Sequence, residues 1–183
     1  GVDPAYPSPQ SPASATDVDL IASAADALSV LDFEPVAKAK LPPCHWAWLS
    51  RGGDGSETMR ANREGFDRYQ IRARRLVDIS KIDTSIRLFG RTWETPIYMS
   101  PVGGHRTYNP EGELATARAA KAKKHLQVLS TVTTTSVEDV NAARGEPVWF
   151  QLYQRDDWGQ TRELLTRAEC AGCPGPVFTV DLL

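Results

Sequence analysis

Short apolar runs alternate with amphipathic runs in the second half of the chain, and this alternation constrains the fold more than any other sequence feature. Four runs rich in β-branched and aromatic residues predict strands, and three longer runs between them predict helices. The strands are Ile97–Ser100, Leu126–Thr131, Val148–Tyr153 and Val177–Leu183, and the helices are Glu113–Lys124, Val137–Arg144 and Thr161–Ala171. Strict alternation specifies parallel strands with right-handed crossovers. Because a closed eight-stranded βα barrel takes about 250 residues, we expect this chain to supply half of a larger α/β unit.

The first half of the chain has a different pattern. Residues 1–18 include four prolines and three serines, which is too little apolar surface to offset the entropy of ordering, so they predict a mobile arm. Apolar periodicity and proline positions then predict three helices and a short hairpin meander. The predicted helices are Asp19–Leu31, a second through Lys40 that Asp32 caps, and a third that begins after Pro43 and ends at Gly52. The meander uses Arg75–Ser80, Ser85–Phe89 and Arg91–Glu94.

Composition excludes several classes of function. The chain has 21 Lys and Arg against 23 Asp and Glu, so it has no basic excess to bind nucleic acid. No apolar run approaches the roughly 18 to 20 residues that span a bilayer. Cys170 and Cys173 close a helix instead of opening one, which argues against a redox pair. Glu111 and Glu113 lie at a predicted helix N-terminus and are interpreted as structural residues that favour its dipole.

Small and polar residues lie at or just after the end of each predicted strand. In parallel α/β architectures the carboxyl ends of the strands carry the working groups. The residues are Pro101, Val102 and Gly103 after the first strand, Ser130 at the end of the second, Gln151 and Tyr153 at the third, and Thr179 and Asp181 at the fourth. Such a lining suits a planar heteroaromatic ligand and suits a metal poorly, since it lacks His and Cys. Simple capping of the sheet by polar residues is the alternative.

A set of motifs matches one enzyme family in order and spacing. The motifs are Leu41-Pro42, Gly52-Gly53, Glu57-Thr58, residues 72–78 (RARRLVD), Pro96-Ile97, residues 110–113 (PEGE), Leu129-Ser130-Thr131, residues 150–153 (FQLY) and Thr179-Val180-Asp181. Over about residues 30–183 the chain resembles the FMN-dependent 2-hydroxy acid oxidases and dehydrogenases, which include glycolate oxidase, lactate oxidase, mandelate dehydrogenase and the flavin domain of flavocytochrome b2. The resemblance implies a TIM (β/α)8 barrel, whose N-terminal half is residues 19–183: the N-terminal helices, a β-hairpin and the first four strands.

The resemblance also implies FMN as the cofactor and a role for each matching residue. Pro101, Val102 and Gly103 correspond to the backbone that lies against the isoalloxazine ring. Ser130, Gln151 and Thr179 match the side chains that hydrogen-bond the flavin's polar edge. In the family's catalytic set, Tyr153 matches a substrate-contacting tyrosine and Asp181 matches the carboxylate that orients the catalytic histidine. That histidine has no counterpart in this sequence.

Two positions depart from the family pattern. Trp48 stands where the family has a substrate-binding tyrosine, and an indole cannot replace a phenol atom for atom. Val132 stands where glycolate oxidases carry tryptophan. We therefore expect a substrate larger or more apolar than glycolate, with neutral drift in a packed core as the alternative.

The resemblance implies oxidation of a 2-hydroxy acid to a 2-oxo acid. In the family, the second half of the barrel supplies the catalytic histidine, an arginine and a lysine. We therefore expect activity only when a complementary C-terminal chain or fragment completes the barrel, and a higher homo-oligomer of that unit. An FMN-dependent isomerase and a non-catalytic flavin-binding or assembly module stay open, as do exported and cytoplasmic locations.

Overall fold

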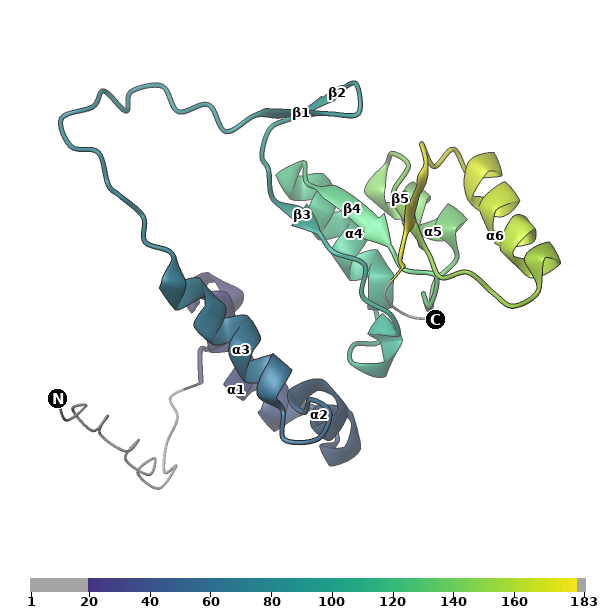
Figure 1. The fold of residues 1–183 in the computed structure, drawn as a ribbon, viewed down its shortest axis with the longest axis horizontal. Coiled ribbons are helices and arrows are strands. Elements are labelled where there is room, and N and C mark those ends of the chain that lie inside the picture. Colours follow the sequence, from purple (N-terminus) through teal and green to yellow (C-terminus); the bar gives the residue numbers. More distant parts are fainter. Residues whose placement is uncertain (1–19, 181–183) are drawn as a thin grey trace, which may run out of the picture. The chain divides into compact units, whose positions relative to one another are not determined.

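A computed structural model describes residues 20–180, which belong to two compact units. One unit ends at Arg68 and the other begins at Tyr69 (Figure 1). The predicted arm over residues 1–18, the start of the first predicted helix and the candidate residue Asp181 lie outside the described residues.

The first unit is helical. It contains two 3-10 turns, three α-helices and a closing 3-10 turn. These are η1 (Ala24–Asp26), η2 (Val30–Asp32), α1 (Phe33–Lys40), α2 (Pro43–Ser50), α3 (Glu57–Glu64) and η3 (Gly65–Arg68). The predicted second and third helices are confirmed as α1 and α2. Proline occupies the first turn of each, where its missing N–H has no helical partner to lose.

The predicted continuous helix over Asp19–Leu31 is wrong in its described part. Two serine-aspartate pairs interrupt it, because each pair closes a capping box around a single 3-10 turn. The Asp26 carboxylate accepts a hydrogen bond from the backbone N–H of Ser23 at 2.8 Å. The Asp32 carboxylate does the same for Ser29 at 2.8 Å, so Asp32 does not cap α1 with its side chain as predicted.

The second unit opens with an extended stretch and a two-stranded hairpin. Strands β1 (Ile86–Leu88) and β2 (Arg91–Trp93) pair antiparallel, which confirms the predicted hairpin. Its turn places Gly90 at φ +80°, a conformation that glycine adopts without steric cost. Arg75–Ser80 forms no strand. The Asp78 side chain instead accepts a hydrogen bond from the Ser80 N–H at 2.9 Å, which turns the chain locally.

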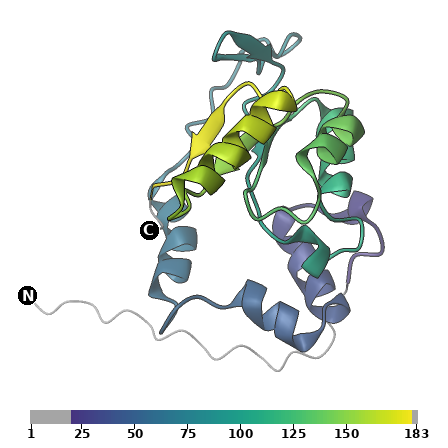
Figure 2. The same ribbon diagram turned by 90° about the vertical axis from the view of Figure 1, so that its right-hand side faces the viewer.

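Four parallel strands form the sheet of the second unit. Strands β3 (Tyr98–Met99), β4 (Leu126–Leu129), β5 (Trp149–Leu152) and β6 (Pro176–Phe178) lie in the order β3-β4-β5-β6. The connections contain η4 (His105–Thr107), α4 (Gly112–Lys123), α5 (Val137–Arg144) and α6 (Trp158–Cys170). Figure 2 shows the chain turning from the end of α6 back into β6. The predicted alternation and parallel pairing are therefore confirmed.

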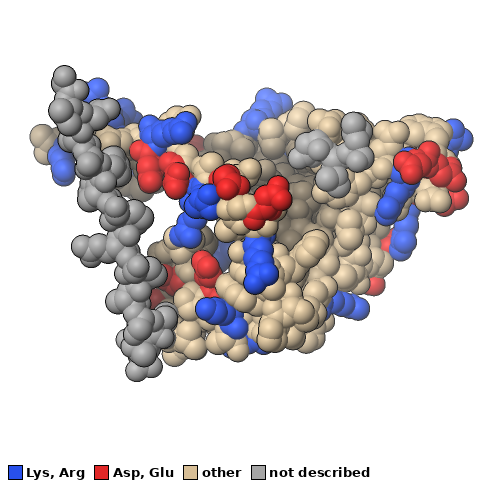
Figure 3. Space-filling model, turned by 60° about the horizontal axis from the view of Figure 1, so that its bottom comes forward, with Lys and Arg blue, Asp and Glu red and all other residues tan. Residues whose placement is uncertain are grey.

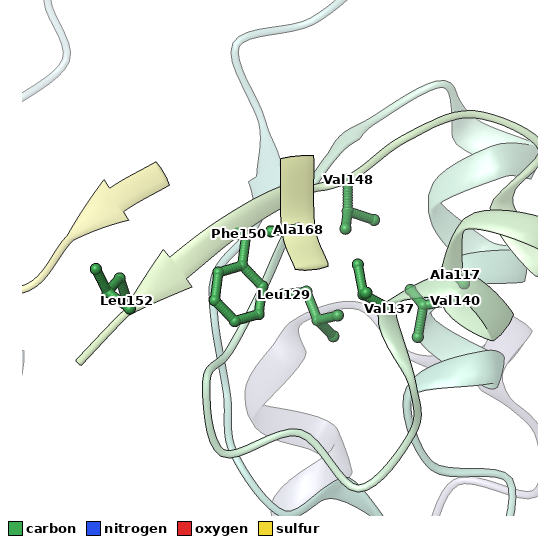
Figure 4. Packing of buried hydrophobic residues seen from close by; sticks show 8 residues of the cluster. All are labelled: Ala117, Leu129, Val137, Val140, Val148, Phe150, Leu152 and Ala168. Atoms are coloured by element: carbon green, nitrogen blue, oxygen red, sulfur yellow. The ribbon is translucent and has the colours of Figure 1, made fainter. Parts of the chain in front are cut away.

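The core of this unit lies between the sheet and its helices. Leu129 and Phe150, from adjacent strands, face Val140 on α5 and Ala168 on α6 (Figure 4). All four are at most 5% exposed. Packing on one face of each strand leaves alternate residues to point away from the helices, and these include Ser130 and Gln151 at the strand ends.

Charged side chains of both signs are interspersed on the face shown in Figure 3. Within residues 20–180, none of the helices is long and apolar enough to cross a membrane.

Candidate functional site

Three polar side chains form a hydrogen-bonded row across the carboxyl ends of β4, β5 and β6. The Ser130 hydroxyl donates to Gln151 Oε1 at 3.2 Å. The Gln151 Nε2 donates to the Thr179 Oγ1 at 2.8 Å. Ser130 and Gln151 are 4% and 2% exposed. The structure therefore brings together the three side chains that the sequence predicted to act as one group.

Thr131 extends the pairing of β4 with β5 beyond the last strand residue. Its hydroxyl donates to the Gln151 carbonyl at 2.6 Å and accepts from the Tyr153 N–H at 3.0 Å. The Thr131 N–H also donates to Gln151 Oε1 at 3.1 Å. The Gln151 side chain thus receives two donors and is fixed in one orientation.

The loop after β3 lies directly against the loop after β4. The Gly104 N–H donates to the Val132 carbonyl at 2.9 Å. A Cβ atom on Gly103 would come within 3.1 Å of the Val132 Cβ atom, so a larger residue at position 103 would push the two loops apart. Val102 and Val132 remain 51% and 55% exposed. These loops present a half-exposed apolar surface beside the polar row.

The side chain of a buried glutamate contacts both of these loops. Glu113, in the first turn of α4, is 1% exposed. Its carboxylate accepts hydrogen bonds from the Thr134 N–H at 2.8 Å and from the hydroxyls of Thr134 and Thr135 at 2.6 and 2.8 Å. Burial alone would raise the pKa of Glu113, but these donors lower it to about 2. Sequence reasoning treated this residue as a helix-dipole partner and missed its contacts, which lie 21 and 22 positions away.

The remaining predicted residues are placed as follows. Pro101 lies half-buried between β3 and the Gly103 contact, and Tyr153 lies half-buried just after β5. Trp48 lies on α2 of the first unit and is 79% exposed. Asp181 is outside the described residues.

The donor set fits a planar ligand with a polar edge. Two hydroxyls and an amide can each donate and accept, and the glycine-containing loop beside them allows a close backbone approach. Across residues 20–180, no three His, Cys, Asp or Glu side chains lie where they could hold a metal ion.

Comparison with known proteins identifies one family. The family model described as FMN-dependent dehydrogenase matches residues 37–183. Glycolate oxidase 3 of Oryza sativa subsp. indica is 39% identical over 153 residues, which are 84% of this chain and 42% of the relative. L-lactate oxidase of Lysinibacillus sphaericus (strain C3-41) is 38% identical over 172 residues, covering 91% of this chain and 45% of the relative.

Solved structures give the same result. A crystal structure of mandelate oxidase superposes with a TM-score of 0.79 at 37% identity, covering 85% of this chain and 45% of that one. A mandelate oxidase variant with a C4a-OH-FMN adduct superposes with a TM-score of 0.77. The chain spans less than half the length of the relatives named here.

These matches confirm three predictions. The α/β fold is the N-terminal part of a TIM barrel, the parallel strands β3 to β6 are its first four, and FMN is the family's cofactor. The family match covers 147 of the 183 residues, counted from 37 to 183. The chain therefore belongs to the FMN-dependent dehydrogenase family.

Proposed function

We propose that the protein containing this chain oxidises a 2-hydroxy acid to a 2-oxo acid with FMN, and that it does so when the second half of the barrel is present. The observation that carries this proposal is the row of Ser130, Gln151 and Thr179, linked by hydrogen bonds of 3.2 and 2.8 Å across three strand ends, with Ser130 and Gln151 buried and Thr179 half-buried. A row of this composition at the carboxyl ends of barrel strands is where such an enzyme holds its cofactor.

The residues of this chain divide the work of holding FMN. Gln151 and the two hydroxyls would hydrogen-bond the polar edge of the flavin, since each can donate or accept as the ring requires. The backbone of Pro101, Val102 and Gly103 would lie against the ring, because the glycine at 103 keeps that loop free of a bulky side chain. Bound FMN supplies the acceptor for the two electrons that leave the substrate's α-carbon.

Tyr153 and Trp48 match positions at which the family contacts its substrate. The Tyr153 phenol can donate a hydrogen bond to the substrate carboxylate or hydroxyl. Trp48 would offer one indole N–H where the family has a phenol. Asp181 would hold and charge the imidazole of a histidine that the second half of the barrel supplies, as the buried acid of a hydrolase triad does.

The second half of the barrel would be the partner of this chain. It would bring the catalytic histidine, a carboxylate-binding arginine and a lysine beside the flavin. The relatives support this, because this chain accounts for 42% and 45% of the lengths of two of them. We further propose a homo-oligomer of the completed unit.

The substrate class follows from the surface beside the row. Val132 is 55% exposed and contributes a small apolar side chain where tryptophan would fill the space. A substrate larger or more apolar than glycolate would fit there, and the similarity to mandelate oxidase at 37% identity supports such a substrate.

Anaerobic flavin reduction tests the proposal. The flavin-loaded protein is mixed with glycolate, lactate or mandelate in the absence of oxygen, and the flavin absorbance near 450 nm is followed. Bleaching by a 2-hydroxy acid, fastest with the bulkier acids, is the expected result. Bound flavin that no hydroxy acid bleaches would contradict the proposal and favour an isomerase or a non-catalytic flavin-binding module.

A further inference from the structure

We propose that Glu113 is a positioning residue for the flavin face: its carboxylate holds the loop after β3 and the loop after β4 at the spacing that FMN binding requires. This inference rests on the proposed function, because it concerns the same site.

The carboxylate receives donors from both loops. From the loop after β4 come the N–H and hydroxyl of Thr134 and the hydroxyl of Thr135, at 2.6 to 2.8 Å. From the loop after β3 comes the His105 N–H, at 3.4 Å. The two loops meet again where the Arg106 N–H donates to the Thr134 hydroxyl at 3.2 Å. Glu113 therefore lies at the centre of the junction.

The same helix makes a second attachment to the loop after β3. Thr116, one turn beyond Glu113, places its hydroxyl 3.2 Å from the His105 Nδ1. Side chains three positions apart lie on one face of a helix, so this face of α4 holds both loops. The orientation of α4 is thereby transmitted to them.

The junction sets the separation of the residues that would face the flavin. Gly103 and Val132 belong to the same two loops, which are also joined where the Gly104 N–H donates to the Val132 carbonyl at 2.9 Å. The clearance is narrow, since a Cβ atom on Gly103 would come within 3.1 Å of the Val132 Cβ atom. A small movement of either loop at Glu113 would therefore move the surface against which the ring packs.

The group at the centre of this junction is a buried carboxylate and not an apolar side chain. Glu113 is 1% exposed, and within residues 20–180 it forms no ion pair with Lys, Arg or His. Burying a carboxylate without a cation is costly unless several donors satisfy it. An apolar residue would fill this space at less cost, but it could not direct two loops at once.

The test compares two glutamate-to-glutamine substitutions, Glu113→Gln and Glu111→Gln, at positions two residues apart. Glu113→Gln keeps the size of the side chain but replaces one carboxylate oxygen by an amide group. Glu111→Gln removes an exposed carboxylate that bonds Arg118 across the surface and not the loops. Both variants are prepared as the flavin-loaded protein. The readouts are the FMN dissociation constant and the visible absorption and circular dichroism of the bound flavin, with kcat and KM where turnover is present.

We expect Glu113→Gln to weaken FMN binding by about 10-fold and to shift the flavin spectrum, because small displacements in a positioned site have large effects. Glu111→Gln should match the wild type. If Glu113→Gln fails to fold, Thr134→Val removes one of the donors and should give the same changes in smaller measure.

The outcomes separate this inference from the proposed function. The inference alone would be overturned if the wild-type protein binds FMN and Glu113→Gln has the same FMN affinity and flavin spectrum. The same holds for Thr134→Val where it replaces Glu113→Gln in the test. A wild-type protein that takes up no FMN would overturn the proposed function. Equal losses in Glu111→Gln and Glu113→Gln would also overturn the inference, because they would point to the helix N-terminus and not to the loop junction.

Discussion

The charge state of Glu113 couples stability to pH. Burial raises the pKa of this carboxyl, but the Thr134 and Thr135 donors outweigh it, and the pKa falls from 4.5 to about 2. A group whose pKa is lower in the folded state contributes stability above the unfolded value and loses it as the pH falls toward the folded value. The difference corresponds to about 3 kcal/mol at neutral pH.

We therefore expect the protein to lose up to about 3 kcal/mol of its free energy of unfolding through this residue as the pH falls from 5 to 2. Denaturant unfolding of the wild type and Glu113→Gln at several pH values measures it. The gap in free energy of unfolding between the wild type and Glu113→Gln should narrow as the pH falls. A gap that stays constant from pH 7 to pH 3 would show that the Glu113 charge contributes nothing.

Val132 is expected to decide which acids fit beside the flavin. Val132→Trp should lower kcat/KM for mandelate by at least about 10-fold while changing the value for glycolate less, because the indole fills the space over which a large substrate would lie. Val132→Leu provides a graded control with an intermediate effect. Steady-state kinetics with both acids checks this, and equal losses for the two acids would refute the steric explanation.

The site was predictable where neighbouring strands present residues at one edge. Ser130, Gln151 and Thr179 each lie within a strand that the apolar pattern predicted or near its carboxyl end, so parallel topology alone brings them together. Glu113 was not predictable in the same way. Its partners are set by how two loops fold over α4, and no local pattern records such a contact.

Among the elements, α5 is a case in which the local sequence is sufficient to predict the structure. Its bounds, Val137–Arg144, agree with the prediction because local chemistry defines both ends. The Ser136 hydroxyl caps the start by accepting from the Asp139 N–H at 3.1 Å. Gly145 ends it at φ +84°, where other residues would be strained.

For helix α3 and for the segment Arg75–Ser80, the local sequence is not sufficient to predict the structure. Helix α3 (ETMRANRE) is polar on nearly every side, so it has no apolar stripe from which a helix could be predicted. Arg75–Ser80 has apolar residues typical of a strand, but Leu76 is fully exposed and Ile79 is 74% exposed. A strand needs a neighbour with which to pair, and this stretch has none among the described residues.

Arg144 is expected to hold together the amino ends of strands β4 and β5. Its side chain is fully buried and forms an ion pair with Glu146 at 2.9 Å. It also donates to the carbonyls of Pro147 at 2.9 Å and His125 at 3.0 Å, and its guanidinium lies 5.9 Å from the centre of the Trp93 ring on β2. One residue of α5 thus ties together the starts of β4 and β5 and the hairpin.

Arg144→Met should destabilise the protein by about 3 kcal/mol, because it leaves buried carbonyls without their charged donor. Arg167→Met is the matched control. Arg167 pairs with Glu138 at 2.9 Å but its side chain is 59% exposed, so its loss should destabilise the protein much less. Denaturant unfolding measures both, and equal effects would refute the anchoring role.

At the scale of the whole molecule, the sheet has an open edge at β6. Phe178 and Val180 there are 52% and 72% exposed. The Thr179 N–H donates to the Leu152 carbonyl of β5 at 3.1 Å. Because successive N–H groups along a strand point to opposite sides, those of Phe178 and Val180 point away from β5, where a fifth barrel strand would pair.

Hydrogen exchange of these three amides distinguishes a half-barrel from a completed one. In the chain of residues 1–183 alone, we expect the amides of Phe178 and Val180 to exchange quickly and the Thr179 amide to be protected as an internal reference. When the polypeptide that supplies the remaining strands is added, the two fast amides should slow by at least about 10-fold, because a neighbouring strand accepts their hydrogen bonds. If they stay fast while flavin binds and is reduced by a hydroxy acid, then β6 is not where the barrel is completed, and the activity does not depend on closing this edge.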